Sequence, residues 1–122
     1  QVSSNVITSR SEGSTRGRIT GTVAEYQEYA RERCAVYGWS DNDFSSLVKL
    51  WNRESGWNPN TRNSSSGAYG IPQALPASKM ASAGSDYMTN YKTQINWGLS
   101  YIRSRYGSPS SAWSYFQSNG WY

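Results

Sequence analysis

The sequence predicts one all-α domain of about five helices, with little or no sheet. A length of 122 residues suits a single ordinary core. Apolar residues recur at the three- and four-residue spacing of amphipathic helices, and no segment shows the strict alternation of a half-buried strand. Aromatic residues make up 15% of the chain, so large rings can fill this core although aliphatic residues are sparse.

Residues 1–22 predict a flexible tail or linker. They are rich in Ser, Thr, Arg and Gly and show no apolar period. The folded domain is therefore expected to span residues 23–122.

The first helix is expected to follow the capping box formed by Thr22 and Glu25, and to stop at Gly38. Cys34 lies on its apolar stripe and is expected in the core, with an exposed thiol that pairs between molecules as the alternative. The stripe consists of Val23, Tyr26, Ala30, Cys34 and Tyr37.

The second helix is expected to start near Ser40 or Asp41, where Asp41 and Asp43 suit both the cap and the positive end of the helix dipole. Glu54 follows three residues after the last member of its apolar stripe. A carboxyl group is therefore expected at the end of a buried helix face, where burial would keep it protonated near neutral pH. The stripe is Phe44, Leu47, Val48 and Trp51.

A long, turn-rich loop is expected over residues 55–73, and loops of this length often build sites. Residues 74–83 predict a short helix with Leu75 and Met80 directed inward. A longer helix is expected over 91–106. The pair Ser108 and Pro109 predicts the cap of a last short helix that contains Ala112, Trp113 and Phe116.

Several chemistries are excluded by composition. The chain has no His and a single Cys, so it cannot assemble a Ser-His-Asp triad, a Cys-His dyad or a His/Cys zinc site. It has no Walker A or G-x-G-x-x-G run, and no cofactor or metal is expected. The formal charge of +4 is not gathered into a basic stripe, and no apolar run reaches the roughly 18 residues of a membrane span. Neither nucleic acid binding nor membrane insertion is expected.

A compact group of motifs surrounds Glu54. Glu54 and Ser55 are followed by Trp57 and Pro59, and then by the segment GAYGIPQ at residues 67–73. These motifs resemble the soluble-type lytic transglycosylases of the lysozyme-like superfamily, and the similarity extends roughly from 44 to 116. The GIPQALP stretch and the sequence GWY at 120–122 are most similar to the actinobacterial branch.

The resemblance implies a compact lysozyme-like fold and cleavage of the MurNAc-β-1,4-GlcNAc bond of peptidoglycan. Glu54 would be the single general acid and base, and the products would carry 1,6-anhydro-MurNAc ends. A monomer at the cell surface or in the secreted fraction is expected, with peptidoglycan glycan strands as its partner. The expected substrate-binding residues are Ser55, Trp57, Tyr69, Gln73 and Tyr115.

Each of these residues also has a structural alternative. Ser55 suits a helix cap, Trp57 and Tyr69 suit the core, and Gln73 could brace the loop backbone. A gapless comparison from Ala112 would place Phe116, instead of Tyr115, at the position of the family's late tyrosine.

Most glycosidases use two carboxyl groups, so a second one near Glu54 would favour hydrolysis. Asp41 and Asp43 lie roughly 16–20 Å before Glu54 along the same helix, which is too far. Asp86 remains, although it suits a local cap. A hydrolytic lysozyme that uses Asp86 or a positioned water is therefore the alternative function, and a non-catalytic peptidoglycan-binding module is the second. The other acids are Glu12 in the tail and Glu25, Glu28 and Glu32 on the polar face of the first helix.

Overall fold

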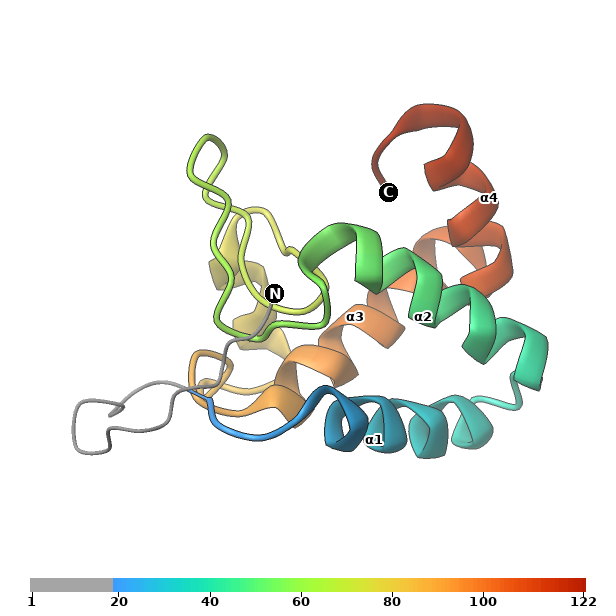
Figure 1. Cartoon of the computed structure of the whole chain (residues 1–122), viewed down its shortest axis with the longest axis horizontal. Helices are drawn as coiled ribbons and strands as arrows, with labels where there is room; N and C mark the ends of the chain where they lie inside the picture. The colour runs from blue at the N-terminus through green and yellow to red at the C-terminus, as the bar shows by residue number, and fades with distance from the viewer. Residues whose placement is uncertain (1–18) are drawn as a thin grey trace.

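The computed structural model describes residues 19–122 and confirms the all-α fold (Figure 1). Within this part of the chain, extended pairing is limited to two isolated bridges, both made by Tyr69. No helix of the described part is long and apolar enough to cross a membrane. The elements are the α-helices α1 (Val23–Val36), α2 (Asp41–Ser55), α3 (Tyr91–Tyr106) and α4 (Pro109–Asn119), and the 3-10 helix η2 (Ala77–Ser82).

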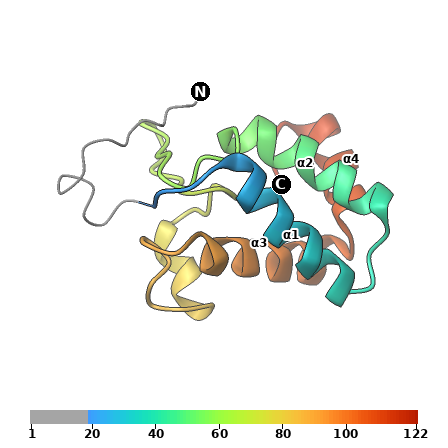
Figure 2. The same ribbon diagram turned by 60° about the horizontal axis from the view of Figure 1, so that its bottom comes forward.

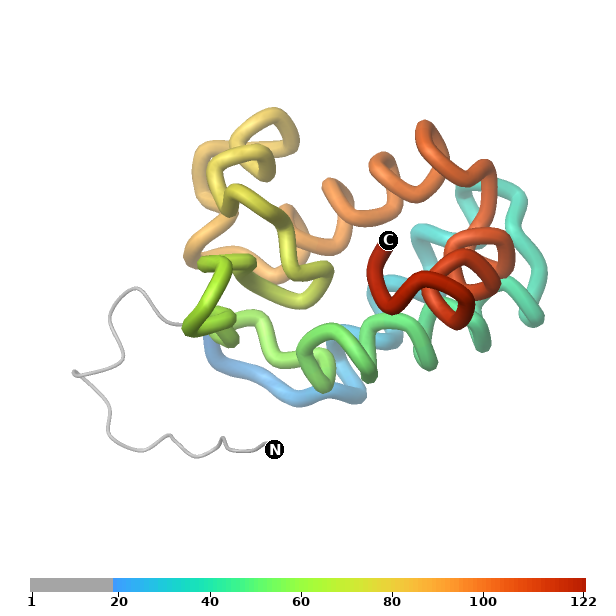
Figure 3. Tube along the Cα trace, turned by 90° about the horizontal axis from the view of Figure 1, so that it is seen from above, coloured from blue at the N-terminus to red at the C-terminus, as the bar shows by residue number. Residues whose placement is uncertain are grey.

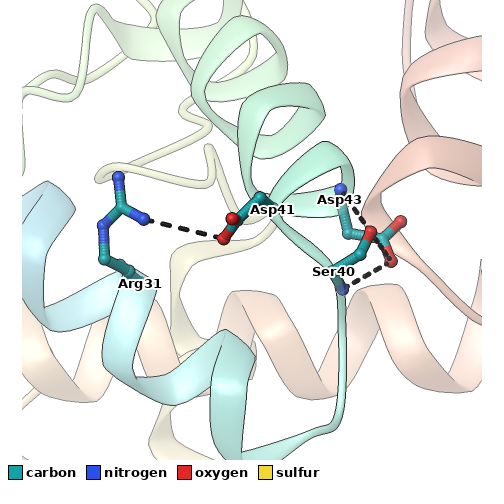
Figure 4. Close-up of polar contacts among 4 residues, drawn as sticks. All are labelled: Arg31, Ser40, Asp41 and Asp43. Carbon is teal, nitrogen blue, oxygen red and sulfur yellow. Dashed lines mark hydrogen bonds and ion pairs between the residues drawn. The ribbon is translucent and has the colours of Figure 1, made fainter.

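The start of α2 is fixed by a reciprocal cap, which Figure 4 shows. The Asp43 amide donates to Ser40 Oγ at 3.1 Å, and the Ser40 amide donates to the Asp43 carboxylate at 3.2 Å. Asp41 lies 3.8 Å from the Arg31 guanidinium on the exposed surface. Both aspartates therefore have the local roles that the sequence predicted, and a similar cap at Thr22 starts α1.

The core lies between α2 and the helices around it. Leu47, Leu50 and Trp51 of α2 are fully buried, as are Leu99 and Ile102 of α3. Figures 1 and 2 show α1 crossing this layer, with the 56–76 loop and η2 gathered at the end of the bundle where α2 stops. From above, in Figure 3, the C-terminal end of the chain lies among that loop, α3 and α4.

The predicted tail and the packed domain overlap at Ile19. Ile19 is buried, and its amide and carbonyl groups both bond to the Asn60 side chain, at 3.0 and 2.9 Å. The packed part of the chain therefore includes Ile19, which composition had assigned to the tail, whereas residues 20–22 are exposed. Residues 1–18 of that predicted tail lie outside the described residues.

Leu75 is a second difference, because its side chain is 51% exposed instead of directed inward. The 3-10 helix begins only at Ala77, so Leu75 lies in a bend before it and helical spacing does not apply there. Met80, within the helix, is buried as predicted.

Candidate active site

A cleft of about 420 Å³ opens at the end of α2. Its walls come from the last turn of α2, the following loop, η2, α3 and the segment after α4. This volume lies within the usual range of small-molecule sites. The cleft is therefore the candidate functional site.

Glu54 lines this cleft from the last turn of α2. Burial raises the pKa of its carboxyl group from 4.5 to about 7, because the charged form is poorly solvated there. Close to neutral pH, both the protonated and the ionised form are present. Such a group can donate a proton in one step and accept one in the next.

The position of Glu54 depends on close packing of α2 against α3. A Cβ atom at Gly98 would lie 2.5 Å from the Trp51 ring, so only glycine lets α3 approach this closely. Trp51 precedes Glu54 by almost one helical turn and is fully buried. Gly56 ends the helix in the left-handed conformation, at φ 64°. The carboxyl group is thus carried by the rigid final turn of a helix.

Ser55 and Trp57 do not line the cleft. The Ser55 hydroxyl donates to the Ile71 carbonyl at 2.8 Å and so braces the loop. Trp57 is completely buried, and its indole N–H donates to the Val48 carbonyl at 3.1 Å. The expectation that Trp57 stacks on a sugar is therefore wrong, because no face of its ring is open. The structure gives Ser55 a structural contact and no place on the cleft surface.

Gln73 does line the cleft, but its amide nitrogen is already engaged. Nε2 donates to the carbonyl oxygens of Thr61 and Gly70, at 3.1 and 3.0 Å. Tyr69 is buried beneath the Arg62 guanidinium, 4.7 Å from its ring centroid, and does not line the cleft. The bracing role is therefore observed for Gln73, and Tyr69 belongs to the packing of the loop.

The loop is also held from beneath by Gln94, which is fully buried. Its Oε1 accepts from the Ile71 amide at 2.9 Å, and its Nε2 donates to the carbonyl oxygens of Pro59 and Tyr87. A Cβ atom at Gly70 would lie 2.6 Å from this Oε1, and Gly70 has a φ of +83°. Gly70 is therefore required for both the space and the backbone conformation.

The late aromatic residues are arranged differently from the prediction. Tyr115 packs on Tyr106 and Trp121, with ring centroids 5.3 and 5.1 Å away, and does not line the cleft. Phe116 lines it instead. The assignment of Tyr115 to the site is therefore wrong, because its place on α4 directs it to this outer aromatic cluster.

Tyr122 lines the cleft, and sequence reasoning missed it. Its hydroxyl accepts from Trp51 Nε1 at 2.7 Å and donates to the Pro72 carbonyl at 3.0 Å. Burial, together with the charge of Glu54, raises the pKa of this phenol well above its ordinary value. Tyr122 therefore stays neutral and links α2 to the loop beside Glu54.

Other aromatic side chains complete the wall. The hydroxyl groups of Tyr101 and Tyr106 donate to the Tyr122 carbonyl at 2.6 and 2.5 Å. Trp97 and Tyr101 line the cleft as a stacked pair, with centroids 5.1 Å apart, and Trp121 lines it while half exposed. Their i, i+4 spacing on the helix predicted over 91–106 was the one signal that could have identified this pair.

Asp86 lies away from the cleft. Its carboxylate accepts from Thr93 Oγ1 at 2.6 Å and from Asn90 Nδ2 at 2.9 Å, and these bonds lower its pKa. It stabilises the start of α3, as the capping alternative predicted. Among the described residues, Glu54 is therefore the only acid that lines the cleft.

Residues 39–118 match the family model described as Transglycosylase SLT domain. The chain belongs to this family. Lytic transglycosylase-type activity on peptidoglycan follows for the family in general. Separate searches of curated proteins and of solved structures gave no match.

The SLT match covers α2, the loop, η2 and α3, and so includes Glu54 and Gln73. It ends before Trp121 and Tyr122. Trp121 and Tyr122 line the cleft of this SLT domain, but they lie outside the residues that the family model matches.

Proposed function

We propose that this SLT domain is a lytic transglycosylase that cleaves the MurNAc-β-1,4-GlcNAc bond and leaves 1,6-anhydro-MurNAc ends. One observation carries the proposal. Among the described residues, Glu54 alone brings a side-chain carboxyl group to the cleft, and burial raises its pKa to about 7.

The chemistry needs only this one group. Protonated Glu54 donates its proton to the bridging oxygen, and the bond between that oxygen and C1 of MurNAc breaks. The resulting carboxylate then removes the proton of the C6 hydroxyl of the same sugar, and the C6 oxygen bonds to C1. The internal hydroxyl takes the place of water, so no second carboxylate has to activate a nucleophile.

The environment of Asp86 supports this reaction over two-carboxylate hydrolysis. Two-carboxylate glycosidases place their acids about 5–9.5 Å apart across the scissile bond. The Asp86 carboxylate is instead occupied by Thr93 and Asn90 at the start of α3. Its low pKa also makes it a poor base.

The proposed substrate determines where the enzyme works. Peptidoglycan lies outside the cytoplasmic membrane, so we propose a secreted or cell-surface location. We also propose that the domain acts as a monomer.

Carboxyl-to-amide variants test this assignment. Glu54→Gln preserves shape but cannot donate the catalytic proton, so muropeptide release should fall at least about a thousandfold with the fold intact. The matched change Asp86→Asn should retain most activity. Turnover of purified cell wall, with circular dichroism as the folding control, checks both. An inactive Asp86→Asn variant would instead support a hydrolase, and an active Glu54→Gln variant would rule out Glu54 as the acid.

A further inference from the structure

The cleft contains two basic side chains in addition to Glu54, those of Arg53 and Lys79. Neither forms an ion pair, since the one salt bridge among residues 19–122 joins Arg31 to Asp41. The site is therefore more positive than the modest net charge of the chain suggests. Both side chains are exposed, so water solvates their charges and both remain available to a ligand.

The two cations approach the cleft from different elements. Arg53 belongs to α2 and immediately precedes Glu54, and its guanidinium lies 5.6 Å from the ring centroid of Phe116. Phe116 itself lines the cleft, so this contact holds the guanidinium at the site. Lys79 belongs to η2. A ligand in the cleft would therefore meet a cation from each of two elements.

None of the seven acidic side chains of the described region pairs with these cations, and three of them, Glu25, Glu28 and Glu32, lie on α1 without a salt bridge. Asp43 is committed to the cap of α2, and Asp86 to the start of α3. Asp41 pairs with Arg31. Glu54, which must be protonated to act as an acid, carries no charge in its active form. Anionic ligands are therefore favoured over neutral ones.

We propose that Arg53 and Lys79 form a subsite for carboxylate groups carried by the glycan strand. This inference rests on the proposed function, because it concerns the substrate of that same cleft. A guanidinium can hold a carboxylate through two parallel hydrogen bonds, and an ammonium group adds a compact charge. Peptidoglycan offers carboxylates from two sources: the stem peptide, or the lactyl group of MurNAc where the peptide has been removed. Neutral GlcNAc oligomers carry neither.

The binding of these ligands is compared with the Glu54→Gln protein, which is expected not to cleave them. Three glycans of equal length would be compared: one with stem peptides, one stripped by an amidase, and a neutral GlcNAc oligomer. We expect at least one carboxylate ligand to bind about three- to tenfold more tightly than the neutral one. Adding Arg53→Gln or Lys79→Gln should remove this preference. Lys49→Gln is the matched control, because Lys49 is an exposed cation of α2 that does not line the cleft.

The pattern of loss identifies the source. Loss confined to the peptide-bearing glycan assigns the subsite to the stem peptide, and loss confined to the stripped glycan assigns it to the lactyl group. Equal binding of all three ligands, or equal loss for the neutral oligomer, would overturn the subsite. The parent protein's cleavage products are analysed separately: anhydro ends without a carboxylate preference overturn the subsite alone, whereas reducing ends overturn the proposed function alone.

Discussion

Glu54 combines two properties that a single catalytic group needs, a rigid position and a pKa close to the working pH. The final turn of α2 provides the position. Burial of the carboxyl group raises its pKa to about 7. A surface glutamate would be ionised at that pH and could not act as an acid. The end of the buried helix face therefore gives Glu54 the position and the pKa that the proposed reaction needs.

This burial should be visible in the pH dependence of stability. Glu54 binds its proton more tightly in the folded state, where its pKa is about 7, than in the unfolded state, where it is 4.5. The folded protein is therefore favoured below pH 4.5, and this contribution is lost as pH rises to about 7. Glu54→Gln does not titrate, so it should be more stable than the parent at pH 8, by at most about 3 kcal/mol, with little difference at pH 4.

Urea unfolding at the two pH values measures this difference. The same titration predicts that kcat/KM of the parent falls above about pH 7, as the acid loses its proton. A stability difference between the two proteins that does not change with pH would show that the carboxyl group is not desolvated.

Cys34 illustrates burial without function. It is 2% exposed, and burial together with the charge of Asp43 raises its pKa to about 12. Its thiolate fraction at pH 8 is therefore very small, and native protein should react slowly with a thiol reagent. Denatured protein is the control and should label fully within minutes. Fast, stoichiometric labelling of the native protein would place Cys34 at the surface.

At the scale of elements, Tyr122 joins parts of the chain that meet only in the fold. Its hydroxyl bonds to Trp51 of α2 and to Pro72 of the loop, and its carbonyl accepts from Tyr101 of α3. Three walls of the cleft are therefore held by one residue. The alignment of Glu54 with the loop depends on this link.

Tyr122→Phe tests the link, because it removes the hydroxyl and retains the ring. Two buried polar groups, on Trp51 and Pro72, would lose their partner, which costs about 1–3 kcal/mol. We expect a lower melting temperature and a loss in kcat larger than the change in KM. Tyr37→Phe is the control, since the Tyr37 ring contacts Trp39 and Arg103 and does not line the cleft. A variant with parental stability and kcat would show that this link does not position Glu54.

At the scale of the whole molecule, the sequence predicted what depends on local signals. The bounds of α1, α2 and α3 were predicted closely from the capping box at Thr22, the aspartates that follow Ser40 and the apolar stripes. The stripe predicted that Glu54 ends a buried helix face, and the resemblance of the motifs around it singled this residue out as the candidate acid.

Contacts between distant residues could not be predicted in this way. Tyr122 lies 71 residues from Trp51, and Ile19 lies 41 residues from Asn60. Trp57 was assigned to substrate binding because the sequence next to a helix end does not show whether a tryptophan ring packs in the core or stacks on a sugar. Only the packing of the loop against α2 places it in the core.

The central claim is that Glu54 works without water as a nucleophile, and cleavage in water labelled with heavy oxygen tests it most directly. Purified cell wall would be digested in labelled water and the new MurNAc ends examined by mass spectrometry, with Glu54→Gln as the background control. Ring closure by the C6 hydroxyl predicts anhydro ends that contain no label. One labelled oxygen for each bond cleaved, on reducing MurNAc ends, would contradict the account.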